Sequence, residues 1–196
     1  MLEIETLETG IVRAAALVVN DGQRIMLSGE SGSGKSVFLR ALADLLPWQG
    51  ELRLDGQSVH DLPAHQWRRR VMLLEAESAW WAERIIDHFP ENAIPDLVKL
   101  GLEQNLLDRP PSRVSSGQRQ RLALLRALAR EPRVLLLDEP TANLDPENTN
   151  KLEAMLRRWS EAGGMLIMTS HDAGQRQRLG SHFWHVNNAQ VGVLAS

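Results

Sequence analysis

A glycine-rich segment near the start of the chain has the residue types and spacing of a phosphate-binding loop. Its sequence is Gly29-Glu30-Ser31-Gly32-Ser33-Gly34-Lys35-Ser36, and it lies between a predicted strand and a predicted helix. Glycines let the backbone curl so that successive N–H groups point at phosphate oxygens, and the helix N-terminus adds its positive end. We expect Lys35 to reach the β- and γ-phosphates of a nucleoside triphosphate, Ser36 to ligate Mg²⁺, and the contacts to extend to Val37.

Two adjacent carboxylates follow an apolar segment further along the chain. Val134–Leu137 has the continuous hydrophobic character of a strand buried on both faces, and Asp138 and Glu139 come directly after it. In open α/β sheets, ligands bind at the carboxyl ends of the strands. We therefore expect Asp138 to hold Mg²⁺, directly or through water, and Glu139 to polarise the attacking water as a general base. Two solvated acids are the alternative, and the phosphate loop upstream argues against it.

Hydrophobic periodicity places both motifs in an α/β domain. Apolar runs and alternations predict strands at Leu2–Glu5, Ala14–Val19, Arg24–Ser28, Glu51–Leu54, Val71–Leu74, Val134–Leu137 and Met165–Thr169. Helical spacing and proline positions predict helices at about Lys35–Leu45, Pro63–Arg70, Gln118–Arg130, Pro146–Ser160 and Asp172–Leu179. The tail that follows is predicted to form two edge strands.

Residues 76 to about 112 differ in composition from the rest of the chain. They contain Trp80, Trp81, Pro90, Pro95, Pro110 and Pro111, with short helical patches such as Asp96–Leu100. We interpret this stretch as a small, mostly helical lobe inserted into a sheet core formed by residues 1–75 and 113–196. The 196 residues then form a single domain.

Composition and charge argue against several classes of protein. The formal net charge of −3 gives no broad basic field for nucleic acid, and the lack of cysteine excludes disulfides and thiolate metal sites. The acidic start of the chain does not resemble a signal peptide. The longest apolar run, Ala14–Val19, is much shorter than the roughly 18 residues of a membrane-spanning helix. If the protein works at a membrane, we expect another chain to span it.

Three further segments resemble motifs of one family, the ATP-binding domains of ABC transporters. The segment Val114-Ser115-Ser116-Gly117-Gln118 opens a predicted helix and resembles the signature that the family writes LSGGQ. Pro140–Asp145 resembles the segment that follows the catalytic glutamate and ends in the D-loop, and Thr169–Asp172 resembles the switch-histidine region. The order and spacing of these motifs match over nearly the whole chain, from about residue 20 to residue 175.

The resemblance implies a P-loop NTPase fold of the ABC type, with a mostly parallel core sheet, an antiparallel N-terminal β portion and a short helical subdomain. It implies that the chain hydrolyses ATP with Mg²⁺ in a head-to-tail pair. In such a pair, the signature of one protomer closes over the ATP held by the other, through Ser115, Ser116, Gly117 and Gln118. An ordinary helix N-cap followed by glycine is the alternative explanation of these residues.

The resemblance also implies roles for two residues outside the signature, and it implies partners. His171 would contact the γ-phosphate as a catalytic residue beside Glu139, and Asp145 would lie at the contact between the two nucleotide sites. The expected partners are a second ATP-binding domain, as a homodimer, and an integral membrane permease subunit, with no nucleic acid. The chain would then be cytoplasmic and peripheral at the inner face of the cell membrane.

The sequence departs from the family pattern at three points. No aromatic residue precedes the phosphate loop to stack on adenine, so Val12, Arg13 or an aliphatic neighbour would cover the base. The Q-loop glutamine is missing, and Glu77 is the candidate substitute unless Ala76 is the equivalent residue. Ser116 stands where the family has glycine.

Other interpretations remain open. Either one of Trp80 and Trp81 lines a groove that receives a partner helix, or both pack within the lobe. A soluble ABC-type ATPase of DNA repair or translation is a second function, which the short gap between phosphate loop and signature and the single domain argue against. A low-turnover regulatory module is a third, suggested by the missing glutamine and the missing aromatic residue.

Overall fold

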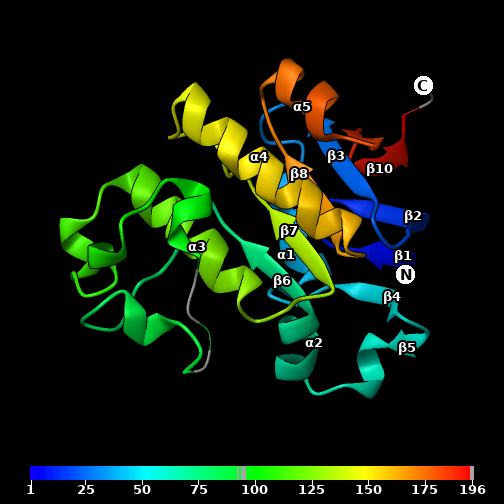
Figure 1. Cartoon of the computed structure of the whole chain (residues 1–196). Coiled ribbons are helices and arrows are strands. Elements are labelled where there is room, and N and C mark those ends of the chain that lie inside the picture. The colour runs from blue at the N-terminus through cyan, green and yellow to red at the C-terminus, as the bar shows by residue number, and fades with distance from the viewer. Residues whose placement is uncertain (92, 94–95, 195–196) are drawn as a thin grey trace.

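One sheet of ten strands runs through the computed structural model, which describes residues 1–91, 93 and 96–194 (Figure 1). The strand order is β5-β4-β1-β2-β10-β9-β3-β8-β7-β6. In chain order the strands are β1 Leu2–Glu8, β2 Arg13–Val19, β3 Arg24–Gly29, β4 Gln49–Leu54, β5 Gln57–Ser58, β6 Val71–Leu74, β7 Val134–Leu137, β8 Met165–Thr169, β9 His182–Asn187 and β10 Gln190–Val193.

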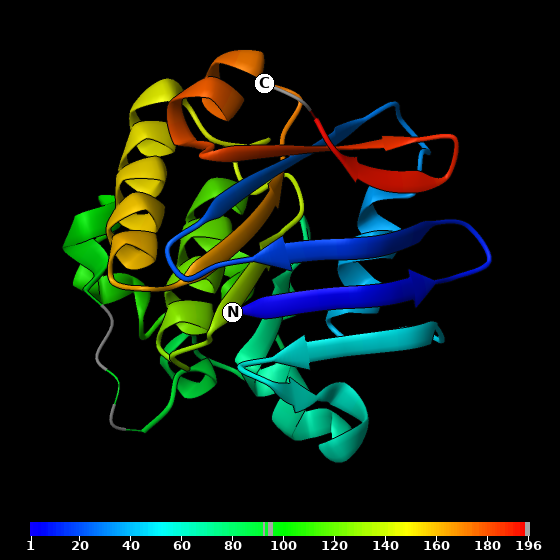
Figure 2. The same cartoon turned by 90° about the vertical axis from the view of Figure 1, so that its right-hand side faces the viewer.

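The sheet has a parallel part and an antiparallel part, as the sequence predicts. Strands β6, β7, β8, β3 and β9 pair in parallel, whereas β2, β1, β4 and β5 pair in antiparallel fashion. Figure 2 shows β2, β1 and β4 side by side. The α/β fold class with an antiparallel N-terminal portion is therefore confirmed.

The prediction that the tail forms two edge strands is wrong. Strand β9 lies between β3 and β10, and β10 lies between β9 and β2, so the tail joins the two parts of the sheet. The side chains of Trp184, Val186 and Val191 are each 2 % exposed. Burial of these apolar side chains favours an interior place in the sheet, which the position of a strand along the chain does not determine.

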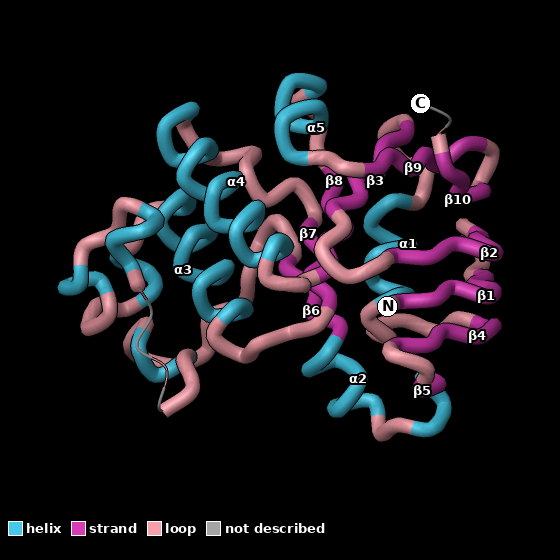
Figure 3. Tube along the Cα trace, turned by 45° about the vertical axis from the view of Figure 1, so that its right-hand side comes forward, coloured by secondary structure: helices cyan, strands magenta, loops and turns pink. Residues whose placement is uncertain are grey.

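Five α-helices cover the sheet in the described part of the chain: α1 Lys35–Leu42, α2 Ala64–Arg70, α3 Ser116–Leu128, α4 Pro146–Glu161 and α5 Ala173–Leu179. Helix α1 lies in the hollow between the parallel and antiparallel parts of the sheet (Figure 3). Its buried Phe38 and Leu39 share one hydrophobic core with strands from both parts. Helices α3 and α4 pack in a second core on the other face of the parallel strands. No described helix combines the length and the apolar character needed to cross a membrane.

The two cores explain the continuous apolar sequence of β7. Val134 and Leu136 point into the core shared with α1, whereas Leu135 and Leu137 point into the core shared with α3 and α4. All four side chains are fully buried. Since successive residues of a strand face opposite sides, a strand covered on both faces needs apolar residues at every position. The first polar residue after β7 therefore lies at its carboxyl end.

The segment between β6 and α3 contains only short 3-10 helices among its described residues. These are Ile86–His88, Leu97–Leu100, Gln104–Leu106 and Pro111–Arg113. Gly101 ends the second of them with a φ of 64°. The buried side chains of this segment belong to the same core as α3 and α4, so its separation as a lobe stays a prediction. Pro95 and residues 92 and 94 of the predicted lobe lie outside the described residues.

A cluster of charged side chains connects the two parts of the sheet at the edge opposite the phosphate loop. Arg133, which precedes β7, donates hydrogen bonds to Asp21 before β3 and to Asp55 in the turn after β4. The hydrogen bond from Arg133 is the main reason why the pKa of Asp55 is held well below its usual range. Asp55 and Arg133 are about one-third exposed, so solvent screens their attraction.

We predict that Asp55→Asn lowers the free energy of unfolding at pH 7 by about 1 kcal/mol, after allowing for solvent screening. Because the pKa of Asp55 is depressed in the folded state, its contribution is complete above the unfolded pKa of about 4 and is lost as the pH falls further. Urea unfolding should therefore show that the difference in free energy of unfolding between wild type and variant is smaller at pH 3 than at pH 7. The control is Glu161→Gln, an exposed carboxylate on α4. An equal difference in free energy of unfolding at both pH values would contradict the conclusion that the ionised Asp55 carboxylate stabilises the fold.

Candidate active site

The phosphate loop connects β3 to α1 at the carboxyl edge of the parallel strands. Gly29, Gly32 and Gly34 have φ angles of 146°, 77° and 104°, which residues with a Cβ rarely adopt. A Cβ on Gly29 would also lie 2.7 Å from Ser33 Oγ and 2.9 Å from the carbonyl oxygen of Val186. The backbone curl that the glycine pattern predicts is therefore present.

The side chains of the phosphate loop lie against its own backbone. Lys35 Nζ donates to the carbonyl oxygens of Gly29 at 2.9 Å and Glu30 at 2.8 Å. Ser33 Oγ is buried and has no hydrogen-bond partner among the described residues. A buried hydroxyl without a partner is unfavourable and marks a place where a ligand atom or a water fits.

Ile11 is the apolar side chain exposed beside the phosphate loop. Ile11 is 55 % exposed, and its Cγ2 atom would lie 3.4 Å from a Cβ on Gly34. Val12, one of the residues expected to cover the base, is 1 % exposed and packs in the core shared with α1. Ile11, the aliphatic neighbour of Val12, therefore has surface that a base could contact, whereas Val12 does not.

The predicted acidic pair lies at the end of β7 and is bonded to the neighbouring strand β8. Thr169 Oγ1 donates to Asp138 Oδ1 at 2.8 Å and accepts from the backbone N–H of Glu139 at 2.9 Å. Strand β8 lies between β3 and β7, so the same edge carries the phosphate loop and both acids. Thr169 was not a predicted site residue. A hydroxyl at the end of an otherwise apolar strand, next to a strand that ends in two acids, is the signal that could have identified it.

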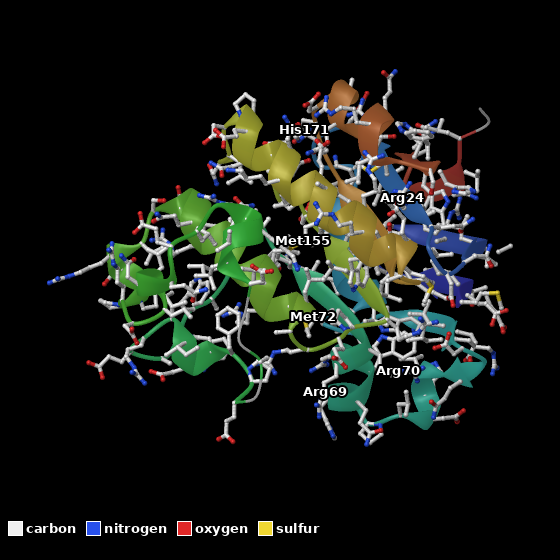
Figure 4. The ribbon with its side chains drawn as sticks, in the orientation of Figure 1. Arg24, Arg69, Arg70, Met72, Met155 and His171 are labelled. Atoms are coloured by element: carbon white, nitrogen blue, oxygen red, sulfur yellow. The ribbon has the colours of Figure 1, made fainter. Side chains whose placement is uncertain are left out.

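The structure brings Glu139 and His171 together. Glu139 Oε1 is 3.5 Å from His171 Nε2, and Glu139 Oε2 accepts from the backbone N–H of His171 at 3.3 Å. The side chain of His171, labelled in Figure 4, is 72 % exposed, whereas that of Glu139 is 22 % exposed. Glu139 Oε1 has no hydrogen-bond partner among the described residues. This oxygen is buried beside His171, so it is an unfilled acceptor position where a ligand atom or a water fits.

The signature segment forms the first turn of α3. Ser115 is the N-cap: its Oγ accepts from the Gln118 N–H, and Gln118 Oε1 accepts from the Ser115 N–H. This capping box explains why α3 begins at Ser116, two residues before the predicted start. A Cβ on Gly117 would lie 3.0 Å from the carbonyl oxygen of Asn143, so only glycine lets this backbone approach so closely. The Ser115 and Gln118 side chains thus cap the helix, which is the alternative explanation given above for these residues. Phosphate binding by this segment stays a prediction.

Asp145 is the N-cap of α4 and lies close to the signature helix. Its side chain accepts from the backbone N–H of Asn148 at 2.8 Å and from Asn148 Nδ2 at 2.6 Å. The backbone hydrogen bond is the main reason why the pKa of Asp145 is lowered. Arg121 on α3 donates to Asn148 Oδ1 and to the carbonyl oxygen of Leu100, so α3 and the start of α4 are linked directly.

The segment after β6 lines a cavity of about 270 Å³ beside α3. The lining residues are Ala76, Glu77, Ser78, Trp80, Ser116, Arg119, Gln120 and Asn143. Gln120 Nε2 donates to the carbonyl oxygen of Glu139 at 3.3 Å, which links this cavity to the acidic pair. Ala76 and Glu77, the two Q-loop candidates, both line this cavity.

The two tryptophans have different environments. Trp80 packs against the core shared with α3 and α4, whereas Trp81 is 69 % exposed. The guanidinium carbon of Arg126 lies 4.4 Å from the Trp80 ring centre and 5.2 Å from that of Trp81. Burial, with a smaller contribution from Arg130, lowers the pKa of Arg126 to about 10. Both rings also lie edge-on to His88 of the same segment, with centroids 4.9 Å and 4.8 Å away, so a groove that receives a partner helix stays a prediction.

The comparison with protein families supports the resemblance. Residues 12–142 match the family model described as ABC transporter. The chain is 33 % identical to the phosphate import ATP-binding protein PstB of Pyrobaculum aerophilum, over 92 % of this chain and 82 % of that protein. It is 34 % identical to the lipoprotein-releasing system ATP-binding protein LolD of Maricaulis maris, over 88 % and 85 % of the two chains.

Solved structures share the fold. The dimeric post-hydrolysis ATP-binding cassette MJ0796 bound to ADP and Pi superposes with a TM-score of 0.78 at 22 % identity, over 100 % of both chains. An ATP-binding subunit of an ABC transporter superposes with a TM-score of 0.80 at 21 % identity, over 99 % of this chain and 90 % of that one. The chain therefore belongs to the ABC transporter family, as an ATP-binding domain that hydrolyses ATP.

Proposed function

We propose that this chain is the ATP-binding subunit of an ABC transporter, which hydrolyses ATP in a head-to-tail dimer and drives a separate membrane-spanning subunit. The observation that carries the proposal is the convergence of three groups on one edge of the sheet. The phosphate loop follows β3, the acidic pair follows β7, and His171 follows β8 between them. The names of the relatives, import and release systems with ATP-binding proteins, support the transport role.

The residues at this edge of the sheet have different roles in ATP hydrolysis. The loop N–H groups and Lys35 hold the β- and γ-phosphates, which fixes the γ-phosphorus in front of the acidic pair. Glu139 accepts the proton as the water oxygen attacks the γ-phosphorus, and the bond from the γ-phosphorus to the bridging oxygen breaks, so that ADP and inorganic phosphate are released. His171 donates a hydrogen bond to the γ-phosphate and keeps Glu139 oriented.

The donor set at this edge fits Mg²⁺. Asp138 Oδ1 is bonded to Thr169, which leaves the other carboxylate oxygen for the metal, and the Ser36 hydroxyl is a neutral oxygen ligand. Mg²⁺ prefers oxygen ligands and usually keeps several waters with only one or two protein carboxylates beside substrate phosphates. When bound, Mg²⁺ neutralises charge on the β- and γ-phosphates. The described residues contain no cluster of three or more His, Cys, Asp or Glu residues that could hold a metal ion by itself.

A second copy of the chain completes the site in this proposal. Ser116 and Gly117 present N–H groups at the start of α3, where the positive end of the helix dipole favours a phosphate. The signature and the phosphate loop are thus two anion sites on different elements of one chain. A two-fold pair brings each signature to the nucleotide of the other copy and makes two equal sites.

The partner that spans the membrane would dock beside the exposed Trp81. Arg126 lies 5.2 Å from the centre of this ring and forms no ion pair with a described acidic residue. An apolar ring beside a positive charge fits a partner segment with apolar and acidic side chains. The chain would then be cytoplasmic and bound to the inner face of the membrane through this partner.

A low-turnover, nucleotide-dependent regulatory module is the second candidate. The exposed Ile11 offers less binding surface to a base than an aromatic ring does, and neither Ala76 nor Glu77 supplies the neutral amide of the Q-loop glutamine. Both changes would weaken nucleotide binding. Steady-state turnover by the purified chain separates the two candidates.

We predict that Glu139→Gln lowers steady-state ATPase activity at least 100-fold, in the range of about 10²–10⁴ for loss of a general base. Mg²⁺-ATP should still bind, because the phosphate loop is unchanged. Phosphate release measures turnover and titration calorimetry measures binding, with Glu161→Gln as a matched control on the surface of α4. Near-normal turnover by Glu139→Gln would remove Glu139 as the base.

We predict that Lys35→Ala weakens ATP binding about 30-fold, since hydrogen bonds to charged groups contribute about 2 kcal/mol. The matched control is Lys99→Ala, which removes an exposed lysine paired with Asp96 far along the chain. Calorimetry with ATP would show the difference between the two variants. Equal ATP affinity in both would mean that the loop does not bind the phosphates.

A further inference from the structure

One buried hydroxyl is bonded to both residues of the acidic pair. Thr169 is 0 % exposed and is the last residue of β8. Its Oγ1 donates its proton to Asp138 Oδ1 and accepts the backbone N–H of Glu139. A hydroxyl has one proton and two acceptor lone pairs, so these two bonds use its donor and one acceptor position. Both contacts connect β8 to the residues that directly follow β7.

The bond to Asp138 determines which of its oxygens is available. Oδ1 accepts the Thr169 proton at 2.8 Å, so the carboxylate plane is fixed by β8 and Oδ2 is left for another partner. The backbone of Asp138 is fixed as well, because its N–H donates to the carbonyl oxygen of Leu74 at 3.0 Å. Without the hydroxyl, the carboxylate could rotate about its terminal bond, whose torsional preference is broad.

The bond to Glu139 holds an unfavourable backbone conformation. Glu139 has a φ of 50°, in the left-handed region that residues with a side chain rarely adopt. Such a conformation is energetically unfavourable and persists only where the surroundings enforce it. The hydrogen bond from the Glu139 N–H to Thr169 is one such constraint, and it directs the Glu139 side chain toward His171.

We propose that Thr169 is a positioning residue for ATP hydrolysis, whose single hydroxyl sets the metal-facing oxygen of Asp138 and the direction of Glu139 together. The inference rests on the proposed roles of those two residues. Thr169 does not touch the nucleotide in this scheme, and it acts through the acidic pair. Its neighbours on β8, Met165 to Met168, are all apolar, so packing alone gives no reason for a hydroxyl at the end of this strand.

Three substitutions that differ in size and in hydrogen bonding test the proposal. Thr169→Val keeps the shape and removes the hydroxyl, Thr169→Ser keeps the hydroxyl and removes the methyl group, and Thr169→Cys has a weak donor. The measurements are kcat and KM for ATP, the Mg²⁺ concentration that gives half-maximal turnover, and ATP affinity in the presence of EDTA. Glu139→Gln is measured beside them to test the proposed function separately.

We expect Thr169→Val to lower kcat about tenfold or more, the effect of one buried hydrogen bond to a charged group. The Mg²⁺ concentration for half-maximal turnover should rise, while ATP affinity in EDTA should stay within about twofold because the phosphate loop is intact. Thr169→Ser should keep kcat within about twofold of wild type, with Thr169→Cys between Thr169→Ser and Thr169→Val.

A packing role predicts the opposite order, because the cavity left by serine would be the larger defect and valine would be tolerated. Full activity of Thr169→Val with unchanged Mg²⁺ dependence, beside an inactive Glu139→Gln, overturns the inference alone. Wild-type turnover by Glu139→Gln overturns the proposed function and the inference with it. If Thr169→Val does not fold, the comparison of serine with cysteine decides: a cysteine variant as active as the serine variant, or more active, overturns the proposal.

Discussion

The parallel pairing of β3, β8 and β7 is the constraint on which the rest of the site depends. Parallel strands end at the same edge, so the phosphate loop, His171 and the acidic pair must meet there once the register is set. The register is fixed by burial, because β7 and β8 carry apolar residues at every position from Val134 to Leu137 and from Met165 to Met168. A shift of one residue would turn each of these side chains to the other core.

Most of the parallel part of the fold can be predicted from the sequence, because its signals are local. The strands β6, β7 and β8 have their predicted ends, and the glycines of the phosphate loop have the positive φ angles that their spacing predicts. The tail was predicted wrongly, since no local signal says which strand a segment will join. Trp184 and Val191 become interior residues because β9 and β10 lie between β3 and β2.

The candidate site also has residues that the sequence predicts and residues that only the structure reveals. Motif spacing identifies Lys35, Asp138, Glu139 and His171, and the structure brings the last two to 3.5 Å. Thr169 escaped prediction because its relevance comes from contacts across the sheet, whereas Ile11 is the aliphatic neighbour of Val12 that the sequence leads us to expect beside the base. A threonine at a strand end has many structural uses, so its type and position carry little information until the neighbouring strand is known.

The contacts around α3 connect the signature segment directly to the loop that follows the acidic pair. The close approach of Gly117 to Asn143 and the bond from Arg121 to Asn148 join the start of α3 to the loop that precedes α4. Gln120 reaches the carbonyl oxygen of Glu139 from the same helix. A close-packed interior does not deform continuously, so the first turns of α3 cannot move far without moving that loop or breaking these bonds. In the proposed head-to-tail pair, a phosphate bound at the signature therefore acts on the segment that holds the other site's Glu139, through contacts that lie within a single protomer.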